Sequence, residues 1–197
     1  MTAASIVKLA RPGDEAAIFD FFVLAQQDNG FFPISSKKVI DVIMKACRNE
    51  AASIGLIKDS NGNIEAASGI TLECAWYSDT YFLSELLNFV HPDHRRSRHA
   101  QALLKFQKDT ADLLSKTFGY SVPIIPGIMT RKRLEPKMRL FQREFQQVGA
   151  LFIYEPKGET SFIKPEDEFT NQRKLELPKK TQPCNANGVR VAAMASA

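Results

Sequence analysis

The side chain in this sequence best suited to proton transfer is Glu85. It is the only carboxylate in the apolar run from Tyr81 to Val90, which reads YFLSELLNFV. Burial in such a run raises the pKa of a carboxyl group toward neutrality, where the group can act as a general base. The alternative is that Glu85 faces solvent or pairs with an arginine. The residue types alone leave both interpretations open.

A basic loop follows this run. Arg95, Arg96 and Arg98 surround Ser97, and a long segment with helical apolar spacing begins directly afterwards. That segment predicts a helix, whose first turn has free backbone N–H groups and a partial positive charge. Such a helix start can hold a phosphate or a pyrophosphate. The alternative is a solvated basic turn that Ser97 caps.

Three histidines, His91, His94 and His99, lie in or beside the loop. A catalytic histidine and a metal site are both alternatives there, but contact with phosphate or a plain surface position suits the polar setting better. The loop is short, and Asp93 is the only acidic residue within it. We therefore expect no metal ion.

Composition places the chain among ordinary globular proteins. It has 197 residues, a formal net charge of +4 and 44% hydrophobic residues, which suits one domain with a substantial core. No apolar run approaches the roughly 20 residues that span a bilayer, and no basic and apolar leader is present, so we expect neither a membrane span nor a signal peptide. The charge is compatible with an anionic ligand and too small to indicate nucleic-acid binding.

The cysteines indicate a reducing compartment. Cys47, Cys74 and Cys184 are far apart and odd in number, so they match neither a zinc-ligand spacing nor a disulfide framework. We expect reduced thiols and a cytoplasmic location. A catalytic thiol would need a histidine neighbour, which the sequence does not place.

The elements that must position these side chains alternate in type. Periodicity and turn signals predict a mixed α/β domain with the order β-α-α-β-β-β-α-β-α-β. The Asn61-Gly62 pair predicts a tight antiparallel hairpin, and the run from Tyr81 to Val90 predicts a strand in the middle of the sheet. The other predicted elements are strands at about 6–9, 53–58, 64–72, 122–128 and 150–154, and helices at about 14–27, 35–49, 99–118 and 135–148.

A change in composition divides the chain. Residues 1–155 carry the periodic elements, whereas residues 156–197 are charged and polar with scattered prolines and no sustained period. We expect this second segment to be a tail or an arm that needs a partner surface. A homodimer across which the tail packs is one such arrangement, and the sequence leaves it open.

One stretch of the chain resembles a known family. The run from Phe89 to Ala100, followed by Leu103-Leu104, is similar to the acetyl-CoA-binding segment of the GNAT acetyltransferases. In that segment a strand ending in Val-x-Pro precedes Arg/Gln-x-x-Gly-x-Gly/Ala and a helix. Arg95 matches the first position of the motif and Ala100 the last, while Arg98 stands in place of the glycine between them. The Arg-Arg-Ser loop looks like that of GNAT-like proteins encoded by bacteriophages, which would place the protein in the host cytoplasm.

The resemblance covers about residues 5–155 and implies a mostly antiparallel, twisted α/β sheet flanked by helices. It also implies acetyl-CoA as the co-substrate, with the pyrophosphate on backbone N–H groups and the pantetheine arm where splayed strands leave backbone groups unpaired. The basic run at 131–133 would meet the adenosine phosphate, unless it is simply solvated. The cofactor-binding residues so implied are Asn88, Phe89, Val90, Arg95, Arg96, Ser97, Arg98, His99 and Ala100.

The chemistry implied is direct transfer of an acetyl group to an amine. Glu85 would deprotonate the ammonium, and backbone N–H groups would stabilise the oxyanion. The segment from Lys137 onward is similar to a later region of the family, which often has a tyrosine at the position of Phe141 as the acid for the departing thiolate. Phenylalanine has no proton to give. Tyr154, Tyr120 or water would substitute, and we take Tyr154 as the second catalytic candidate.

Aromatic residues offer candidates for the acceptor site. In a GNAT fold the region between the first two helices borders that site, so Asn29, Phe31 and Phe32 would shape it. Trp76 and Tyr77 would line the same cleft or lie in a plain loop. Core packing is the alternative for the phenylalanines, because aromatic side chains usually bury.

The sequence therefore leaves three functions in competition. The main hypothesis is an N-acetyltransferase that acts on a small amine, a lysine or a protein N-terminus. A catalytically silent GNAT-like protein, which binds acyl-CoA or another protein, is favoured by Arg98 and Phe141. A nucleic-acid-binding module would use the basic loop, but the chain lacks the charge excess and interleaved aromatics typical of such modules.

Overall fold

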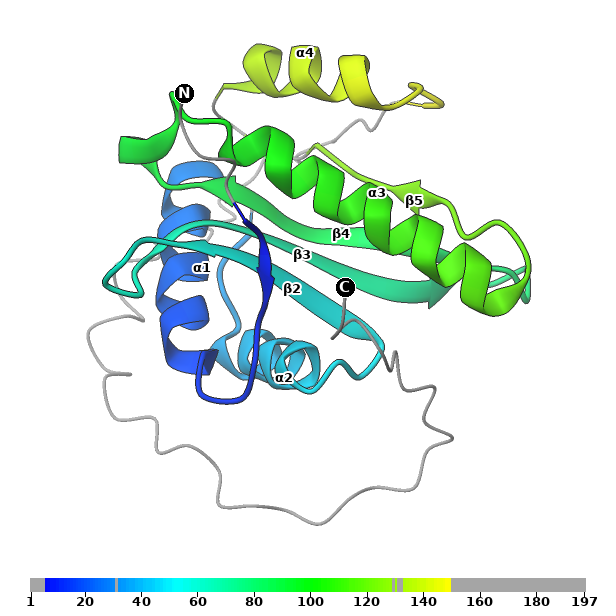
Figure 1. The fold of residues 1–197 in the computed structure, drawn as a ribbon, viewed down its shortest axis with the longest axis horizontal. Helices are drawn as coiled ribbons and strands as arrows, with labels where there is room; N and C mark the ends of the chain where they lie inside the picture. The colour runs from blue at the N-terminus through cyan, green and yellow to red at the C-terminus, as the bar shows by residue number, and fades with distance from the viewer. Residues whose placement is uncertain (1–5, 31, 129, 131–132, 150–197) are drawn as a thin grey trace, which may run out of the picture.

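The computed structural model describes residues 6–30, 32–128, 130 and 133–149 (Figure 1). Tyr154, the strand predicted at 150–154, the boundary at 155 and the tail at 156–197 lie outside the described residues. Within them the elements follow the predicted order and confirm an α/β fold. They are β1 (Lys8–Leu9), α1 (Glu15–Asn29), α2 (Ser36–Cys47), β2 (Ala52–Lys58), β3 (Ile64–Cys74), β4 (Tyr81–Val90), the 3-10 turn η1 (Pro92–His94), α3 (His99–Phe118), β5 (Ile124–Ile125) and α4 (Leu134–Glu144).

The described strands form one sheet in the order β1-β2-β3-β4-β5. The neighbouring strands from β1 through β4 pair antiparallel, whereas β4 and β5 pair parallel. The predicted hairpin joins β2 to β3. Gly62 there has a φ of 89°, which glycine adopts without steric cost, and the Asp59 carboxylate accepts hydrogen bonds from the backbone N–H groups of Asn61 and Asn63. The mostly antiparallel sheet expected from the sequence is confirmed.

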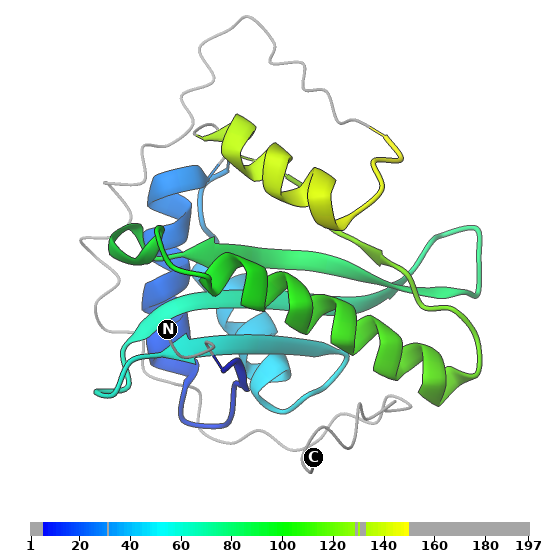
Figure 2. The same cartoon turned by 45° about the horizontal axis from the view of Figure 1, so that its top comes forward.

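Helices cover both faces of the sheet (Figures 1 and 2). On one face, Ile18 of α1 and Ile43 of α2 pack into a cluster with Ile54 of β2. On the other face, Phe106 of α3 packs against Leu83 of β4. The site-bearing strand β4 is therefore held between two apolar layers.

Gly55 in β2 allows α3 to lie close to the sheet. A Cβ atom at this position would be 2.6 Å from Cγ1 of Val7 and 2.8 Å from Cε1 of Phe106. Contacts below 3.0 Å are essentially never made by real Cβ atoms. The absence of a side chain at Gly55 therefore sets the spacing between β2 and the middle of α3.

A bulge in β4 changes which side chains share a face. In the register with β3, Gly69 lies opposite Leu87 and Ile70 lies opposite Glu85, so Leu86 is the extra residue. Residues on the two sides of such an extra residue are out of phase in the alternation of faces. Glu85 and Asn88 consequently point to the same side of the sheet, toward α3, although they are three positions apart.

The strand predicted at 122–128 is shorter in the structure. β5 pairs with β4 only at Leu83 and Ser84. Pro123 and Pro126 flank β5, and their lack of an N–H group limits a longer ladder. No strand among the described residues pairs with this side of β4 beyond Ser84. β4 is thus central over its first half alone, and the sheet opens beyond it.

The helix predicted to run to Val148 ends instead at Glu144, where Phe145 adopts an extended conformation. Figures 1 and 2 show α4 beyond the β4 side of the sheet, next to the beginning of α3. Among the described helices, none combines the length and the hydropathy that crossing a bilayer requires.

Candidate active site

The Glu85 carboxylate lies beneath α3, where β4 parts from β5. Its Oε2 accepts a hydrogen bond from Nε2 of Gln107 at 2.7 Å and one from Nδ2 of Asn88 at 3.4 Å. Burial raises the pKa of Glu85 to about 7, although both hydrogen bonds and the charge of Lys137 act in the opposite direction. The Glu85 side chain is half buried, and the two hydrogen bonds described for it come from amide groups. The role of Glu85 as a base stays a prediction.

Gln107 is the main support of this carboxylate and was missed by the sequence analysis. Its side chain is fully buried, and Nε2 also donates to Oγ of Ser68 at 2.9 Å. Its Oε1 has no hydrogen-bond partner within the described residues. A polar residue on the inner face of the predicted helix was the available signal, because such groups are rarely buried without a polar neighbour.

Lys137, in the first half of α4, acts electrostatically on Glu85. Burial lowers the pKa of the half-buried Lys137 ammonium, whereas the negative charges of Glu85 and Asp28 raise it. Phe141 lies one helical turn further on and is also half buried. Residues four apart share a helix face. Lys137 and Phe141 therefore lie on the same side of α4.

Arg95 anchors the basic loop to α1. Its guanidinium donates a hydrogen bond to the Asp28 carboxylate and lies 5.7 Å from the centre of the Phe89 ring. A cation over an aromatic face is attracted by the ring quadrupole. The Arg95 side chain thus points toward Asp28 of α1.

The remaining loop residues are arranged as a helix start. Oγ of Ser97 accepts a hydrogen bond from the backbone N–H group of His99 at 3.1 Å, but Ser97 is not the N-cap of α3: Arg98 holds that position and makes no side-chain cap hydrogen bond. Arg98 has a φ of −89°, which any residue adopts, so its replacement of the glycine in the motif costs no backbone strain. Arg96, Ser97 and Arg98 are exposed, and Ala100 lies half buried in the first turn of α3.

The three residues implied beside the pantetheine arm differ in what they offer. Phe89 is buried in the core, where its ring packs edge-on against Phe21 at 5.5 Å. Asn88 and Val90 are half buried. Phe89 can therefore contribute only backbone groups to a ligand, whereas the side chain of Asn88 already bonds Glu85.

The histidines have an acidic neighbour that the sequence analysis did not foresee. Glu65 of β3 lies against two of them: its Oε2 is 2.8 Å from Nε2 of His99, and its Oε1 is 3.5 Å from Nδ1 of His94. Nδ1 of His91 accepts a hydrogen bond from the backbone N–H group of Asp93 at 3.3 Å. The expectation of no metal rested on the lack of such a partner.

Other candidates fall away from Glu85 or outside the described residues. Tyr120 stacks on Phe118 at the far end of α3. Trp76 is 95% exposed, and its ring meets Tyr77 in the loop between β3 and β4, so the pair does not line a cleft among the described residues. Phe32 is exposed. Tyr154, Phe31, Arg131 and Lys132 lie outside the described residues.

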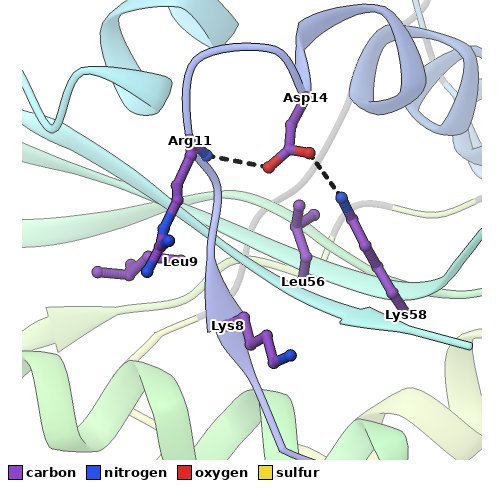
Figure 3. A pocket seen from close by; sticks show the side chains of 6 residues that line it. All are labelled: Lys8, Leu9, Arg11, Asp14, Leu56 and Lys58. Atoms are coloured by element: carbon purple, nitrogen blue, oxygen red, sulfur yellow. Dashed lines mark hydrogen bonds and ion pairs between the residues drawn. The ribbon is translucent and has the colours of Figure 1, made fainter. Parts of the chain in front are cut away.

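A separate pocket lies at the β1 edge of the sheet, opposite the edge formed by β5 (Figure 3). It is lined by residues of β1, β2 and the turn before α1. The Asp14 carboxylate within it is 2.6 Å from Nζ of Lys58 and accepts a hydrogen bond from the backbone N–H group of Arg11 at 3.0 Å. The Asp14 carboxylate is therefore already paired with Lys58, and none of the predicted site residues lies there.

No protein-family model matches the sequence, and no curated protein matches it. Solved structures do match the fold. A ribosomal-protein-alanine N-acetyltransferase from Brucella melitensis biovar Abortus 2308 is 14% identical, with a TM-score of 0.57 over 79% of this chain and 100% of that chain. A predicted acetyltransferase from Clostridium acetobutylicum, solved with acetyl-CoA, is 13% identical, with a TM-score of 0.58 over 76% and 95%.

AAC(6')-Iy is a third similar structure. It was solved in complex with the bisubstrate analogue CoA-S-monomethyl-acetylneamine, and it is 10% identical, with a TM-score of 0.56 over 78% of this chain and 98% of that chain. Identities this low show likeness of fold and nothing finer. The described part of this chain has the fold of the GNAT acetyltransferases.

Proposed function

We propose that this protein is an N-acetyltransferase that moves an acetyl group from acetyl-CoA directly to an amine. The observation that carries the proposal is Glu85, a half-buried carboxylate under α3 that Gln107 holds by a hydrogen bond and whose pKa is raised to about 7. A base with a pKa near the working pH is the most effective one for general base catalysis. Glu85 lies just beyond the last β4 residue that pairs with β5, and the second half of β4 separates it from the loop that leads to α3.

The chain offers a suitable place for the anionic part of acetyl-CoA. The first turn of α3 presents N–H groups that have no acceptor within the helix, and the exposed Arg96 and Arg98 add positive charge around it. The opened side of β4 offers backbone groups from Asn88 to Val90 to the pantetheine amides. Acetyl-CoA supplies the thioester whose acetyl carbon the amine attacks.

Two side chains would then handle protons. Glu85 takes the proton that the amine loses. The lone pair of the amine nitrogen can then form the new C–N bond as the C–S bond breaks. Lys137, whose pKa is lowered by burial, would donate a proton to the leaving thiolate in place of the tyrosine that Phe141 replaces. Tyr154 remains the alternative acid from the sequence analysis.

The second candidate function is a catalytically silent binder of acyl-CoA or of another protein, which Phe141 favours because it cannot give a proton. Nucleic-acid binding is weaker, because Arg95 is already committed to Asp28 and Phe89. The amine acceptor stays open: small amines, lysines and protein N-termini are all compatible. A cytoplasmic location, in a phage host if the phage resemblance holds, belongs to the proposal.

Calorimetric titration with acetyl-CoA tests the cofactor site. We expect binding that weakens about tenfold in Arg96→Ala/Arg98→Ala, because two charge-assisted contacts to phosphate are lost. Arg48→Ala removes an exposed arginine at the end of α2 and serves as the matched control, with unchanged affinity. No detectable binding by the native chain would reject both the enzyme and the acyl-CoA binder.

Release of free CoA thiol, measured across a panel of small amines and basic peptides, separates the enzyme from the binder. We expect Glu85→Gln to lower the rate with the best acceptor roughly 100-fold or more while acetyl-CoA affinity stays unchanged. Lys137→Met should lower kcat and change KM much less. An acceptor-dependent rate that is equal in Glu85→Gln and the native protein would remove Glu85 from the mechanism.

A further inference from the structure

Glu65, His94 and His99 bring three metal-binding side chains together from three different elements. Glu65 is near the start of β3, His94 ends η1, and His99 is the first residue of α3. The backbone already holds these elements together, because the carbonyl of Glu65 accepts a hydrogen bond from the N–H group of His91 at 2.8 Å. The cluster is therefore built on paired strands and a helix end.

The donor atoms lie close to the separation that one ion needs. Each of the three residues offers one ligand atom, and these atoms all lie within 4.8 Å of one another. Zinc binds imidazole nitrogen and carboxylate oxygen at roughly 2.0–2.2 Å, so two ligands of one ion lie at most about 4 Å apart. Binding one ion needs a small adjustment: Oε2 of Glu65 and Nε2 of His99, now 2.8 Å apart, part to admit the ion, and the more exposed His94 approaches by a side-chain rotation.

The cluster is closed on one side and open on the other. His99 is 7% exposed, whereas the side chain of Glu65 is 19% exposed and that of His94 is 40% exposed. A divalent ion can therefore enter past His94. A water molecule can fill the remaining coordination position from the same side, and a carboxylate among the ligands offsets part of the charge of the ion.

Neighbouring donors do not belong to this set. Nδ1 of His91 is already an acceptor for the backbone N–H group of Asp93 and lies 3.6 Å from its carboxylate. Cys74 lies at the opposite end of β3 from Glu65. Two imidazole nitrogens and one carboxylate oxygen form a donor set that suits zinc and is unsuited to Mg²⁺ or Ca²⁺, which prefer oxygen ligands.

We propose that Glu65, His94 and His99 form a zinc site, with three protein ligands and one position open to water. The ion would tie the loop between β4 and α3 to the start of β3. This inference is independent of the proposed acetyl transfer, because it needs neither acetyl-CoA nor the Glu85 carboxylate.

The test uses the full-length chain without a polyhistidine tag. The protein is stripped of metal with a chelator, returned to chelator-free buffer and titrated with Zn²⁺ against a chromophoric zinc indicator. We expect one equivalent to bind and the melting temperature to rise, whereas Mg²⁺ should have no such effect. Glu65→Gln and His94→Gln should each weaken binding at least about tenfold and remove the rise in melting temperature. His91→Gln is the matched control and should bind zinc as the native chain does.

His94→Gln is the decisive variant, because the His94 side chain is exposed and its replacement should leave the fold intact. Circular dichroism without metal checks that the variant is folded, so that a loss of zinc binding reports the loss of a ligand. A cluster without metal affinity would show no one-equivalent binding, and this result would overturn the proposal. Binding that is equal in His94→Gln and the native chain would also overturn it. So would loss of binding in His91→Gln, since it would show that the ligands are others.

Discussion

Nε2 of Gln107 donates a hydrogen bond of 2.7 Å to Oε2 of Glu85 from a helix position that has no contact with solvent. Burial and hydrogen bonding act on this carboxylate in opposite directions. Burial raises its pKa by disfavouring the charged form, and the donors from Gln107 and Asn88 lower it by favouring that form. The resulting pKa of about 7 is a balance that single substitutions can shift.

Gln107→Met removes the stronger donor and keeps the length of the side chain. The pKa of Glu85 should rise further, and the pH midpoint of the acetylation rate should move up by roughly one unit, because a hydrogen bond to a charged group contributes about 1.5–3 kcal/mol. The pH–rate profile measures this shift. Gln101→Met, an exposed position on the same helix, is the control and should leave the midpoint in place.

The ionisation of Glu85 should also be visible in stability. Its pKa is about 7 in the folded chain and near the ordinary value of 4.5 when unfolded. The folded state therefore binds the extra proton between these values, and the free energy of unfolding falls as the pH rises through that window. Below pH 4.5 and above pH 7 the contribution no longer changes.

Glu85→Gln cannot ionise and should escape that loss. Chemical denaturation at pH 5 and pH 8 measures the free energy of unfolding of both proteins. The value for the variant, relative to that of the native protein, should be higher at pH 8 than at pH 5 by at most about 3 kcal/mol. The same difference between the two proteins at both pH values would mean that the carboxyl group titrates at its ordinary pKa.

Gly55→Ala should destabilise the fold by about 1–3 kcal/mol, because the new methyl group meets Val7 and Phe106 at distances that force β2 and α3 apart. Urea denaturation measures the loss. Gly127→Ala is the control, since a Cβ atom there meets nothing within 4 Å. Equal stabilities of the two variants would contradict the close approach at Gly55.

Arg95 and Asp28 should be coupled in stability. A double-mutant cycle with Arg95→Met and Asp28→Asn, followed by urea denaturation, should give an interaction free energy of about 1 kcal/mol, because both side chains are partly shielded from water. If the arginine instead pointed toward a phosphate, the two substitutions would be additive. Arg95→Lys should recover only part of the coupling, since lysine lacks the planar group that lies over Phe89.

The sequence allowed most of the fold to be predicted, because local signals determine it. Apolar spacing indicated α1, α2 and α3, and the Asn61-Gly62 pair indicated the hairpin of β2 and β3. Glu85 was found because a single carboxylate in an apolar strand stands out. The shortened β5 was harder, because prolines signal a weak ladder without saying where it ends.

The contacts around the site depend on long-range pairing that a single sequence does not display. Glu65 is 34 positions from His99, and Gln107 is 22 positions from Glu85. The bulge at Leu86 shifts the alternation of faces within β4, so the side of the sheet that Glu85 faces cannot be derived by counting from Phe89. Because of this one extra residue, the alternation of side chains along β4 does not predict which face carries Glu85.

α4 has a consequence for the dynamics of the region around Glu85. None of its side chains is fully buried, its first residue follows Arg133 in a left-handed conformation, and an ion pair of 2.5 Å between Lys108 and Glu144 holds its last turn to α3. Segments with few buried apolar contacts open locally at a free energy far below that of global unfolding. The amide hydrogens of α4 should therefore exchange with solvent sooner than those of α3. We therefore expect α4, which carries Lys137, to unfold and re-form locally while the sheet stays folded.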